Sequence, residues 1–288
     1  MSDPFVTHRS LLFTVAYEML GSAADAEDVV QETWLRWAGA DRCDVRDPRA
    51  YLVRIVTRQA LNRLRTLSRR REDYVGEWLP EPLLTTPDVA EDVELAESIS
   101  MAMLTVLETL TPTERAVFVL REVFDLPYDE IATAIEKTPT AVRQVAHRAR
   151  DRVAAGRPRM QVDRSEQQRV VERFLASLQS GDVQALMEVL APDVVVVADG
   201  GGLVSASLHP VIGARKVAGF LSRFATLLPD AVVDTLWLNG ALGGRITLNG
   251  DVDTVVSFVV DDGRISRMYA VRNPHKLGRL AEEAALAR

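Results

Sequence analysis

The sequence predicts a multi-domain chain in which two all-α modules precede one α+β domain. The 288 residues are enough for two or three domains. Apolar residues recur at helical spacing through most of residues 1–157. After residue 160, helical segments give way to strand-like runs separated by Asn-Gly and Asp-Gly pairs, which are strong hairpin signals. Helices first and an antiparallel meander last are typical of an α+β layer fold.

The composition fits an ordinary folded chain and excludes several protein classes. Apolar residues make up 47% of the sequence, which is sufficient for hydrophobic cores. No apolar run approaches the roughly 18 residues of a membrane helix, and the first residues lack a signal-peptide pattern. Cys43 is the single cysteine, so no internal disulfide can form, which fits a reducing cytoplasm. We therefore expect a cytoplasmic protein that binds no membrane, and no His, Cys or carboxylate set predicts a metal or other cofactor.

The net charge of −7 hides an uneven distribution. Residues 1–71 hold 12 basic and 9 acidic side chains, whereas residues 72–114 hold 11 acidic side chains and no basic one. Residues 115–159 hold 9 basic and 6 acidic side chains, and residues 160–288 hold 13 and 15. Because nucleic-acid binding depends on local patches, the two basic modules are candidates for DNA contact.

An acidic stretch in the first module predicts a surface for a protein partner. Residues 10–35 contain five acids, Glu18 among them, and no base. Residues 25–37 should form an amphipathic helix whose buried side comprises Val29, Val30, Thr33, Trp34 and Trp37. The exposed side that we assign to a basic protein partner comprises Asp25, Glu27, Asp28, Gln31 and Glu32. A merely solvated helix face is the alternative interpretation.

From Pro48 to Arg71 the charge reverses, with eight arginines and no acid. Apolar residues keep helical periodicity through this stretch, which predicts a basic amphipathic helix. Arg58, Asn62 and Arg65 share one face at steps of four and three. Arginines on such a face can hold phosphate without reading sequence, and Asn62 can add a base contact. A membrane-surface helix is the competing interpretation, which the separate DNA-reading element below disfavours.

The acidic connector contains Trp-Leu-Pro-Glu-Pro at residues 78–82. Two prolines around a glutamate stop a helix and favour an extended segment. A tryptophan is costly to leave in water, so we expect Trp78 to dock as an apolar anchor. A flexible spacer with an incidental aromatic is the alternative. Beyond it, residues 88–110 should form one continuous helix that buries Val93, Ile99 and Met103.

Residues 111–153 predict three short helices that end in a DNA-reading element. Thr111 should cap the first, with Glu114 completing a capping box. The third should bury Val142, Val145, Ala146, Ala149 and Val153. Its candidate DNA contacts are Thr140, Arg143, Gln144, His147 and Arg148, with Arg150 and Arg152 as further phosphate ligands. Arg suits guanine and Gln suits adenine because each can bond two base-edge atoms, as in a helix-turn-helix in the major groove. A helical hairpin with a solvated basic face is the alternative.

The last part of the chain predicts a separate α+β domain. We expect helices at 170–179, 183–190 and 215–228, and strands at 194–198, 231–238, 245–248, 252–260 and 265–272. Asp199 and His209 are candidate acids or bases by residue type, but no spacing fixes a pair, so we expect no enzyme. The stretch 199–202 is equally typical of a tight turn that needs glycine.

Residues 25–34, Asp-Ala-Glu-Asp-Val-Val-Gln-Glu-Thr-Trp, closely resemble conserved region 2 of bacterial extracytoplasmic-function (ECF) sigma factors. The resemblance implies that this acidic helix contacts the clamp helices of core RNA polymerase. It also implies that residues 51–65 melt and read the −10 promoter element, and that the loop 41–47 captures a flipped-out base. Residues 111–153 resemble region 4 of the same family, whose helix-turn-helix reads the −35 element.

The C-terminal half resembles SnoaL-like domains, in which helices and a curved sheet form a cone with a pocket. Sigma factors that end in such a domain form the SigJ-type group. Three stretches carry the match, namely Trp78-Leu79-Pro80-Glu81-Pro82, Asp199-Gly200-Gly201-Gly202 and Asn273-Pro274-His275-Lys276-Leu277. The group usually has an acid where this chain has His275. The resemblance implies that the fused domain regulates the sigma factor in place of a separate anti-sigma partner, and these three stretches are its candidate regulatory residues.

The sequence therefore predicts a sigma factor that binds core RNA polymerase and promoter DNA and is modulated by its own SnoaL-like domain. The expected parts are region 2 at 1–72, an acidic linker at 73–98, region 4 at 99–157, the SnoaL-like domain at 160–280 and a tail at 281–288. A small-molecule ligand in the C-terminal pocket stays open as a further partner. Two other classes also stay open: a ligand-responsive helix-turn-helix regulator, and a SnoaL-like enzyme with a nucleic-acid tether.

Overall fold

The computed structural model describes residues 3–40, 45–71, 74–156, 164–223, 228 and 230–288. The chain divides into two compact units. The helical unit comprises Met1–Asp73, Asp88–Arg157 and Ala284–Arg288, and the sheet unit comprises Tyr74–Pro87 and Pro158–Glu283. The chain therefore passes from the helical unit into the sheet unit and back before it completes the second helical part.

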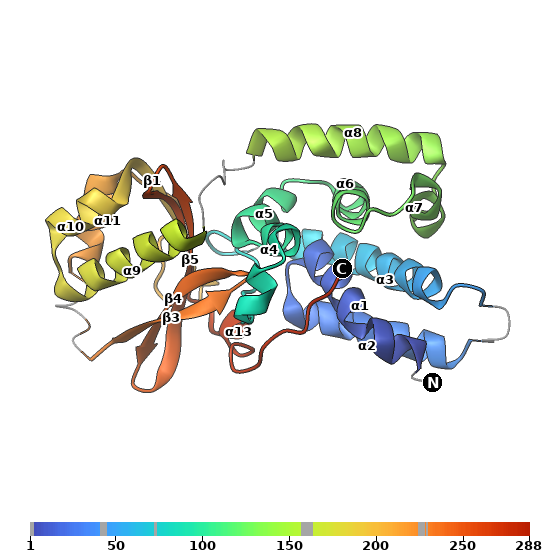
Figure 1. Cartoon of the computed structure of the whole chain (residues 1–288), viewed down its shortest axis with the longest axis horizontal. Helices are drawn as coiled ribbons and strands as arrows, with labels where there is room; N and C mark the ends of the chain where they lie inside the picture. The colour runs from blue at the N-terminus through green and yellow to red at the C-terminus, as the bar shows by residue number, and fades with distance from the viewer. Residues whose placement is uncertain (1–2, 41–44, 72–73, 157–163, 224–227, 229) are drawn as a thin grey trace. The chain divides into compact units, whose positions relative to one another are not determined.

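Three helices form the first part of the helical unit (Figure 1). They are α1 (Pro4–Leu20), α2 (Ala23–Ala38) and α3 (Pro48–Arg71). The Asp3 side chain accepts a hydrogen bond from the Phe5 N–H and caps α1, and Gly21, with φ of 66°, ends it in the left-handed conformation. Ser22 then caps α2 through the Asp25 N–H. The helices pack through fully buried side chains such as Leu12, which excludes water from the bundle.

The second part of the helical unit contains the predicted helix-turn-helix. Its elements are α4 (Val93–Ser98), α5 (Met101–Leu107), α6 (Pro112–Phe118), a π-helical turn (Val119–Val123), α7 (Tyr128–Ile135) and α8 (Pro139–Gly156). The capping box of Thr111 and Glu114 is present at the start of α6. Thr138 accepts from the Ala141 N–H at the start of α8. The five residues expected inside α8 are all buried.

The expected continuous helix over residues 88–110 is wrong. A short 3₁₀ turn at Pro87–Ala90 comes first, and α4 and α5 are separate helices. Ser100 lies between the two helices and bonds to both. Its side chain donates to the Glu97 carbonyl at the end of α4 and accepts from the Met103 N–H at the start of α5. Serine side chains compete with the backbone ladder in this way, which the apolar periodicity alone does not reveal.

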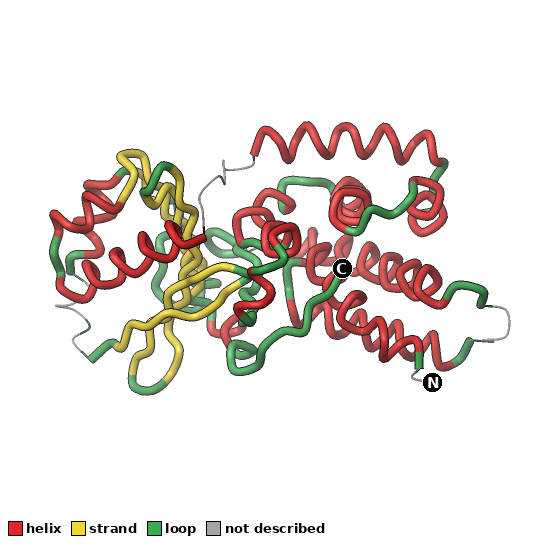
Figure 2. Tube along the Cα trace, in the orientation of Figure 1, coloured by secondary structure: helices red, strands yellow, loops and turns green. Residues whose placement is uncertain are grey.

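The sheet unit has a six-stranded sheet with helices packed on one face (Figures 1 and 2). Its helices are α9 (Arg164–Ser180), α10 (Val183–Val189), α11 (Ala214–Leu221) and α13 (Pro274–Leu277). Its strands are β1 (Leu190–Asp199), β2 (Val211–Ile212), β3 (Val232–Leu238), β4 (Ala241–Leu248), β5 (Asp251–Asp261) and β6 (Arg264–Val271). The strand order is β2-β1-β6-β5-β4-β3, with β1 parallel to β6 and the other pairs antiparallel.

The three predicted hairpin turns are present. The Asn-Gly and Asp-Gly pairs at 239–240, 249–250 and 262–263 all have positive φ, as type I′ turns require. The start of β4 was predicted too late, at Arg245, because Gly243 and Gly244 do not look like strand residues. A Cβ at Gly243 would lie 2.8 Å from the Val256 carbonyl oxygen, so glycine permits the close approach of the neighbouring strand. The expected helix at 215–228 begins at Ala214 and ends at Leu221, and part of its predicted end lies outside the described residues.

Both faces of the central strands are buried. On one face Val194, Phe258 and Met268 belong to a core with α9, α10 and α11. By strand alternation Val259 and Val271 point to the other face, and they are buried as well. A sheet of this kind needs a cover on its second face. The sheet unit contains the linker segment 74–87 and α13 in addition to α9, α10 and α11.

Candidate functional site

A buried carboxylate at the end of β1 binds the linker. Asp199 is fully buried, and among the described residues of the sheet unit its carboxylate accepts four hydrogen bonds. Its Oδ1 accepts from the Tyr74 hydroxyl at 2.6 Å and from the Gly201 N–H at 3.0 Å. Its Oδ2 accepts from the Leu79 N–H at 2.9 Å and from Lys276 Nζ at 2.7 Å. A buried charge is tolerated when it is paired and its lone pairs are used, and Asp199 meets both conditions.

Lys276 binds both Asp199 and the linker backbone. Its ammonium donates to the Leu79 carbonyl at 2.6 Å, in addition to the ion pair with Asp199. It also lies 4.1 Å from the centre of the Trp78 ring and 5.1 Å from that of Tyr74, as in cation–π contacts. The side chain is only 12% exposed, so these contacts act away from bulk water.

Asn273 connects the start of α13 to the same network. Its side chain caps α13 by accepting from the His275 N–H and donates to the Tyr74 hydroxyl at 2.8 Å. Its backbone N–H donates to the Asp199 carbonyl at 2.9 Å. Burial, together with the hydrogen bond to Asp199, raises the pKa of Tyr74 well above its usual value. The tyrosine hydroxyl therefore stays protonated and donates a hydrogen bond to the Asp199 carboxylate.

The three glycines after Asp199 are required by this arrangement. A Cβ at Gly200 would lie 2.5 Å from the Val204 carbonyl oxygen, and one at Gly201 would lie 2.3 Å from Asn273 Nδ2. Gly201 and Gly202 also have φ of 62° and 70°, which other residues rarely adopt. A Cβ at Gly202 would approach Val75 to 3.0 Å. The glycines thus allow the chain to pass close to both the linker and α13.

The linker is held at a second point by the turn between β3 and β4. Leu83 and Asn239 exchange two hydrogen bonds of 3.0 Å, one to the Asn239 side chain and one from its backbone N–H. The Thr85 N–H donates to the Trp237 carbonyl, and Thr85 Oγ1 accepts from the Gly240 N–H. Leu84 forms an antiparallel bridge with Leu238. The linker therefore continues the edge of the sheet for a short distance.

The structure brings together the three stretches that the sequence singled out, but it changes the role of two residues. Trp78 is half-buried against Lys276, and the fully buried anchor is Leu79. His275 is exposed and contributes its backbone N–H alone to Asn273. Pro80, Glu81, Pro82 and Leu277 are buried, whereas Pro274 is exposed. Sequence reasoning missed Tyr74, because no local pattern marks a tyrosine whose partners lie 125 and 199 residues away.

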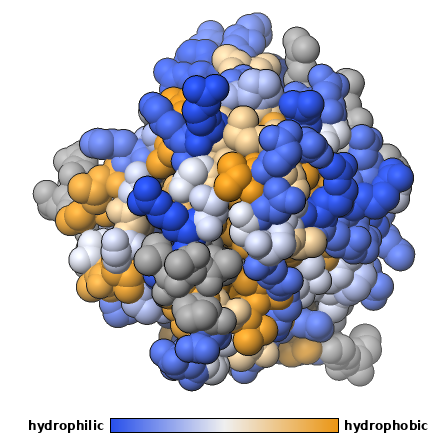
Figure 3. Space-filling model, turned by 90° about the vertical axis from the view of Figure 1, so that its left-hand side faces the viewer, coloured by the Kyte–Doolittle hydropathy of each residue, from blue (hydrophilic) through white to orange (hydrophobic). Residues whose placement is uncertain are grey.

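The two candidate acid–base residues are not paired. Asp199 is buried and its hydrogen bonds go to the linker, Gly201 and Lys276, whereas His209 is exposed. The core between the sheet and α9–α11 is apolar. On the face shown in Figure 3, apolar and polar side chains are intermixed.

The outward face of α8 presents the candidate DNA contacts. Thr140, Arg143, Gln144, His147 and Arg148 are all exposed. The His147 ring pairs with Asp151 at 2.9 Å, and the Arg143 guanidinium lies 5.6 Å from the centre of the Tyr128 ring.

The three arginines of α8 that were expected to bind phosphate all pair with acids of the protein, and Arg148 Nε lies 3.7 Å from the Glu114 carboxylate. Arg150 donates to Glu122 and to the Tyr128 hydroxyl, each at 2.8 Å. Arg152 pairs with the buried carboxylate of Glu114 at 2.6 Å. These contacts fix α8 on α6 and α7, so phosphate binding by these arginines would compete with ion pairs and stays a prediction. Spacing along a helix shows which face a residue occupies but not which acid lies across from it.

The basic helix α3 contacts the helix-turn-helix within the helical unit. Arg58 donates to the carbonyls of Thr133 and Ala134 at 3.1 Å and lies 3.3 Å from the Glu136 carboxylate. Its guanidinium therefore caps the end of α7, as cations do at helix C-termini. Asn62 and Arg65 are exposed on the same helix, bonded to each other at 3.4 Å.

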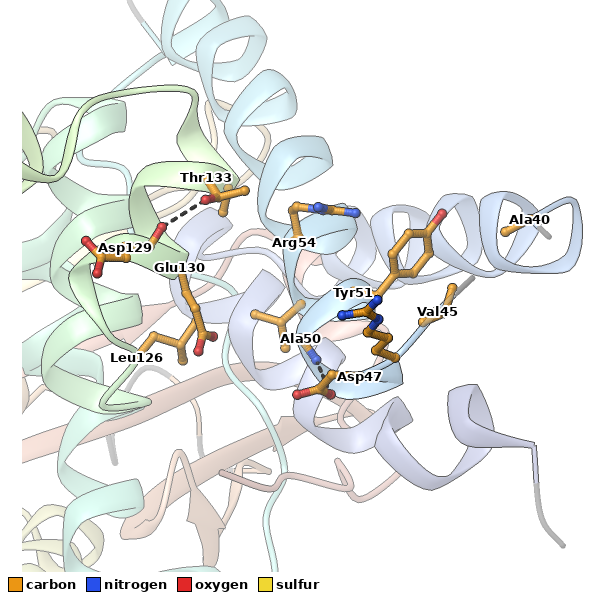
Figure 4. Close-up of a pocket in the computed structure, with 13 residues that line it drawn as sticks. Ala40, Val45, Asp47, Ala50, Tyr51, Arg54, Leu126, Asp129, Glu130 and Thr133 are labelled. Atoms are coloured by element: carbon orange, nitrogen blue, oxygen red, sulfur yellow. Dashed lines mark hydrogen bonds between the residues drawn. The ribbon is translucent and has the colours of Figure 1, made fainter. Parts of the chain in front are cut away.

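A cavity of about 710 Å³ lies between the start of α3 and α7 (Figure 4). One wall is formed by Arg46, which precedes α3, and by Tyr51 and Arg54 of α3. The other wall includes Asp129 and Glu130 of α7. Residues 41–44 of the predicted base-capturing loop lie outside the described residues, and the remainder of that loop borders this cavity. In this arrangement α7 forms one wall of the surface that was expected to meet melted DNA.

The acidic face of α2 is exposed in part. Asp28, Gln31 and Glu32 are exposed, Glu27 pairs with Arg9 at 2.8 Å, and Asp25 accepts from Arg63 at 2.7 Å. The sequence assigned no position to Glu18, and the expected burial of Trp34 is wrong. Glu18 is fully buried, because its side of α1 faces α4 and α6. Trp34 is 37% exposed, because it packs its ring on Phe5 at the edge of the bundle.

Comparison with known proteins gives the same assignment for both helical parts. Residues 5–70 match the family model of Sigma-70 region 2, and residues 100–153 match that of Sigma-70 region 4. The ECF RNA polymerase sigma factor SigJ of Mycobacterium tuberculosis is 36% identical over 287 residues, covering 94% of this chain and 91% of SigJ. This chain belongs to the ECF RNA polymerase sigma factors.

Other relatives of this sigma factor agree along the whole chain. A probable ECF sigma factor, SigI of M. tuberculosis, is 31% identical, covering 98% of this chain and 97% of SigI. The crystal structure of M. tuberculosis SigJ superposes with a TM-score of 0.78 at 33% identity, covering 95% and 96% of the two chains. The predicted fold class is confirmed in that two helical sigma regions precede an α+β domain with one sheet. Across the described part of this sigma factor, we find no helix with the length and apolar character needed to cross a membrane.

The geometry around Asp199 predicts that the linker detaches when one charge is removed. Lys276→Met leaves Asp199 buried without its cation, and breaking a buried pair in this way costs roughly 3–5 kcal/mol. Hydrogen exchange of the amides of residues 74–86 should therefore accelerate at least tenfold. His275→Ala, one residue away and exposed, is the matched control and should leave exchange unchanged. Equal exchange in both variants would show that the ion pair does not hold the linker.

Proposed function

We propose that this sigma factor is regulated by its own sheet unit, which holds the segment between regions 2 and 4 on one fixed path. The observation that carries this proposal is the double attachment of residues 74–87, at Asp199 and at the turn between β3 and β4. Because this segment joins the two promoter-binding regions, fixing it restricts the separations that they can sample. Without this attachment, regions 2 and 4 would sample a wider range of separations.

The arrangement of the helical unit supports an inhibited state of the free protein. The −10 and −35 elements lie about 25 base pairs apart, on the order of 80 Å along B-DNA. Arg58 of region 2 is bonded directly to α7 of region 4. Since a single contact cannot span that distance, the two regions must separate before both elements can be read. Any device that keeps the helical unit closed therefore lowers promoter binding.

We assign DNA recognition to exposed residues of α8 and α3. Arg143 and Gln144 read base edges of the −35 element, while Thr140, His147 and Arg148 position the helix on the backbone. Arg58, Asn62 and Arg65 meet the −10 region after α7 has left α3. Core RNA polymerase binds the acidic face of α2, through Asp25, Glu27, Asp28, Gln31 and Glu32.

We assign no catalytic role to the sheet unit. Asp199 is committed to the linker, and a pocket ligand would act by changing linker attachment. Such a ligand is an apolar small molecule if it enters the core between the sheet and α9–α11, because that core is lined by aliphatic and aromatic side chains. The protein acts where the polymerase is, in the cytoplasm.

The regulatory proposal is tested by run-off transcription with the full chain and core polymerase. Tyr74→Phe removes the hydroxyl that donates to Asp199 and costs about 1–3 kcal/mol of attachment. It should raise transcription several-fold at limiting sigma factor, and Lys276→Met should raise it further. His275→Ala should transcribe like the parent protein. Unchanged transcription in Tyr74→Phe and Lys276→Met, with exchange data showing the linker released, would contradict regulation through the linker.

Base reading is tested by comparing two arginines of the same helix. Arg143→Ala should cost roughly 1–3 kcal/mol at the preferred −35 sequence and relax the preference there. Arg148→Ala should weaken binding to all sequences alike and reduce the salt dependence. Selection of binding sites from random DNA measures both effects. The same selected sequence from Arg143→Ala and the parent would disprove the base contact.

The polymerase face is tested by charge reversal at its two exposed acids. Asp28→Lys with Glu32→Lys should reduce capture of core polymerase at least tenfold, because like charges then face a basic partner surface. Binding to −35 DNA should remain, since α8 is untouched. The double variant Glu166→Lys with Glu172→Lys on α9 changes the net charge equally and serves as the control. Equal capture by the two double variants would rule out this face.

A further inference from the structure

A buried carboxylic acid lies where three parts of the helical unit meet. Glu18 on α1 is fully buried. Its Oε1 lies 2.8 Å from Ser98 Oγ on α4, and its Oε2 has no hydrogen-bond partner. Arg115 on α6 donates from Nε to the Glu18 backbone carbonyl at 2.9 Å. The three residues belong to the region 2 match, the connector and the region 4 match, respectively.

The hydrogen bonds around Ser98 fit a protonated Glu18. Ser98 Oγ also lies 2.9 Å from the Leu95 carbonyl oxygen, which can only accept. A hydroxyl has one proton, so it cannot donate to both the carbonyl and a carboxylate. A protonated Glu18 donates from Oε1 to Ser98 while Ser98 donates to Leu95, so each of the two protons has one acceptor.

The nearby cations do not neutralise an ionised Glu18. The Arg115 guanidinium is ion-paired with Glu108, and its bond to Glu18 goes to the backbone. Arg288, from the segment 284–288, is the second cation that acts on the carboxyl, and it is paired with Glu94. α2, α3 and the π-helical turn, which carries Arg121 and Glu122, also pack on α1. Within the described residues they place no charged group that shifts the pKa of Glu18. Burial outweighs the hydrogen bond and both cations and raises the pKa of Glu18 to about 8.

Promoter binding requires this junction to open, by the distance argument given above, on which the inference rests. Separation of α1 from α4 and α6 exposes the Glu18 carboxyl to water. We propose that Glu18 is a proton-dependent latch, which closes regions 2 and 4 on each other when it is protonated and releases its proton when they separate.

The sign of the pH dependence follows from linkage. The closed state holds one more proton than the open state at any pH between the ordinary carboxyl value of 4.5 and about 8. Within that window, each unit of rising pH lowers the ratio of closed to open protein by up to tenfold. Above about pH 8 the ratio becomes constant. Alkalinisation therefore activates the free sigma factor, and acidification locks it.

Single-molecule energy transfer on the full chain tests the latch. Dyes are placed at Leu35→Cys on α2 and Lys137→Cys before α8, both exposed, in a Cys43→Ser background. In the parent protein the closed-to-open ratio should fall about tenfold per unit between pH 6 and 8. Glu18→Gln keeps the shape and hydrogen bonds of the protonated acid, so its ratio should not change with pH. Glu91→Gln, at an exposed acid between the 3₁₀ turn and α4, is the control and should behave like the parent.

Several results overturn the latch. One is the same pH slope in Glu18→Gln as in the parent, and another is a parent protein that stays closed throughout pH 6–9. If Glu18→Gln does not fold, carbon NMR of the Glu18 carboxyl in the parent decides the matter. A midpoint near 8 supports the latch, and one near 4.5 refutes it. Neither measurement includes polymerase or promoter DNA, so failure of the latch is distinguishable from failure of linker regulation.

Discussion

The need to satisfy one buried carboxylate organises the sheet unit. Asp199 can remain charged and buried because four donors reach it, and two of them, Tyr74 and Leu79, come from the linker. Without the linker, Asp199 and Lys276 would keep each other but lose the other hydrogen bonds and the aromatic cover of the ammonium. The linker is therefore part of this domain's structure as well as its connection to the sigma regions. A chain cut after region 4 removes the linker's partners along with the domain, so point variants separate the two roles better than truncation does.

Local sequence signals predicted what local forces determine. The capping box at Thr111, the buried face of α8 and the three hairpin turns depend on residues within a few positions of one another, and all are present. The family resemblance singled out the linker, glycine and α13 stretches, and the structure brings them together. Contacts between residues far apart in the sequence could not be predicted in this way. Tyr74, Leu79, Glu18 and Arg58 all acquire their roles from contacts more than 70 residues away, and no periodicity encodes such contacts.

Partners across the helices sort the arginines of the helical unit into two sets. Arg115, Arg150 and Arg152 are held by acids and hold helices together. Arg143, exposed and resting near the Tyr128 ring, has no acid in contact within the described residues and is available for DNA. Arg58 belongs to the first set while the unit is closed and joins the second when α7 leaves. Arg58 thus bonds either to the α7 carbonyls or to DNA phosphate. At this position the closed helical unit and the DNA-bound state are therefore mutually exclusive.

The two regulatory devices use different chemistry and share no residue. The linker is held by an ion pair and aromatic contacts around Asp199, whereas the latch depends on one proton at Glu18. Free energies at sites without shared partners add, so each device should shift the balance between inhibited and active protein by a factor independent of the other. Release of the linker alone then leaves the helical unit closed by its latch at acidic pH, and loss of the proton alone leaves the linker fixed. Because independent factors multiply, only both together allow the widest separation of regions 2 and 4, and each device needs to contribute only a modest bias.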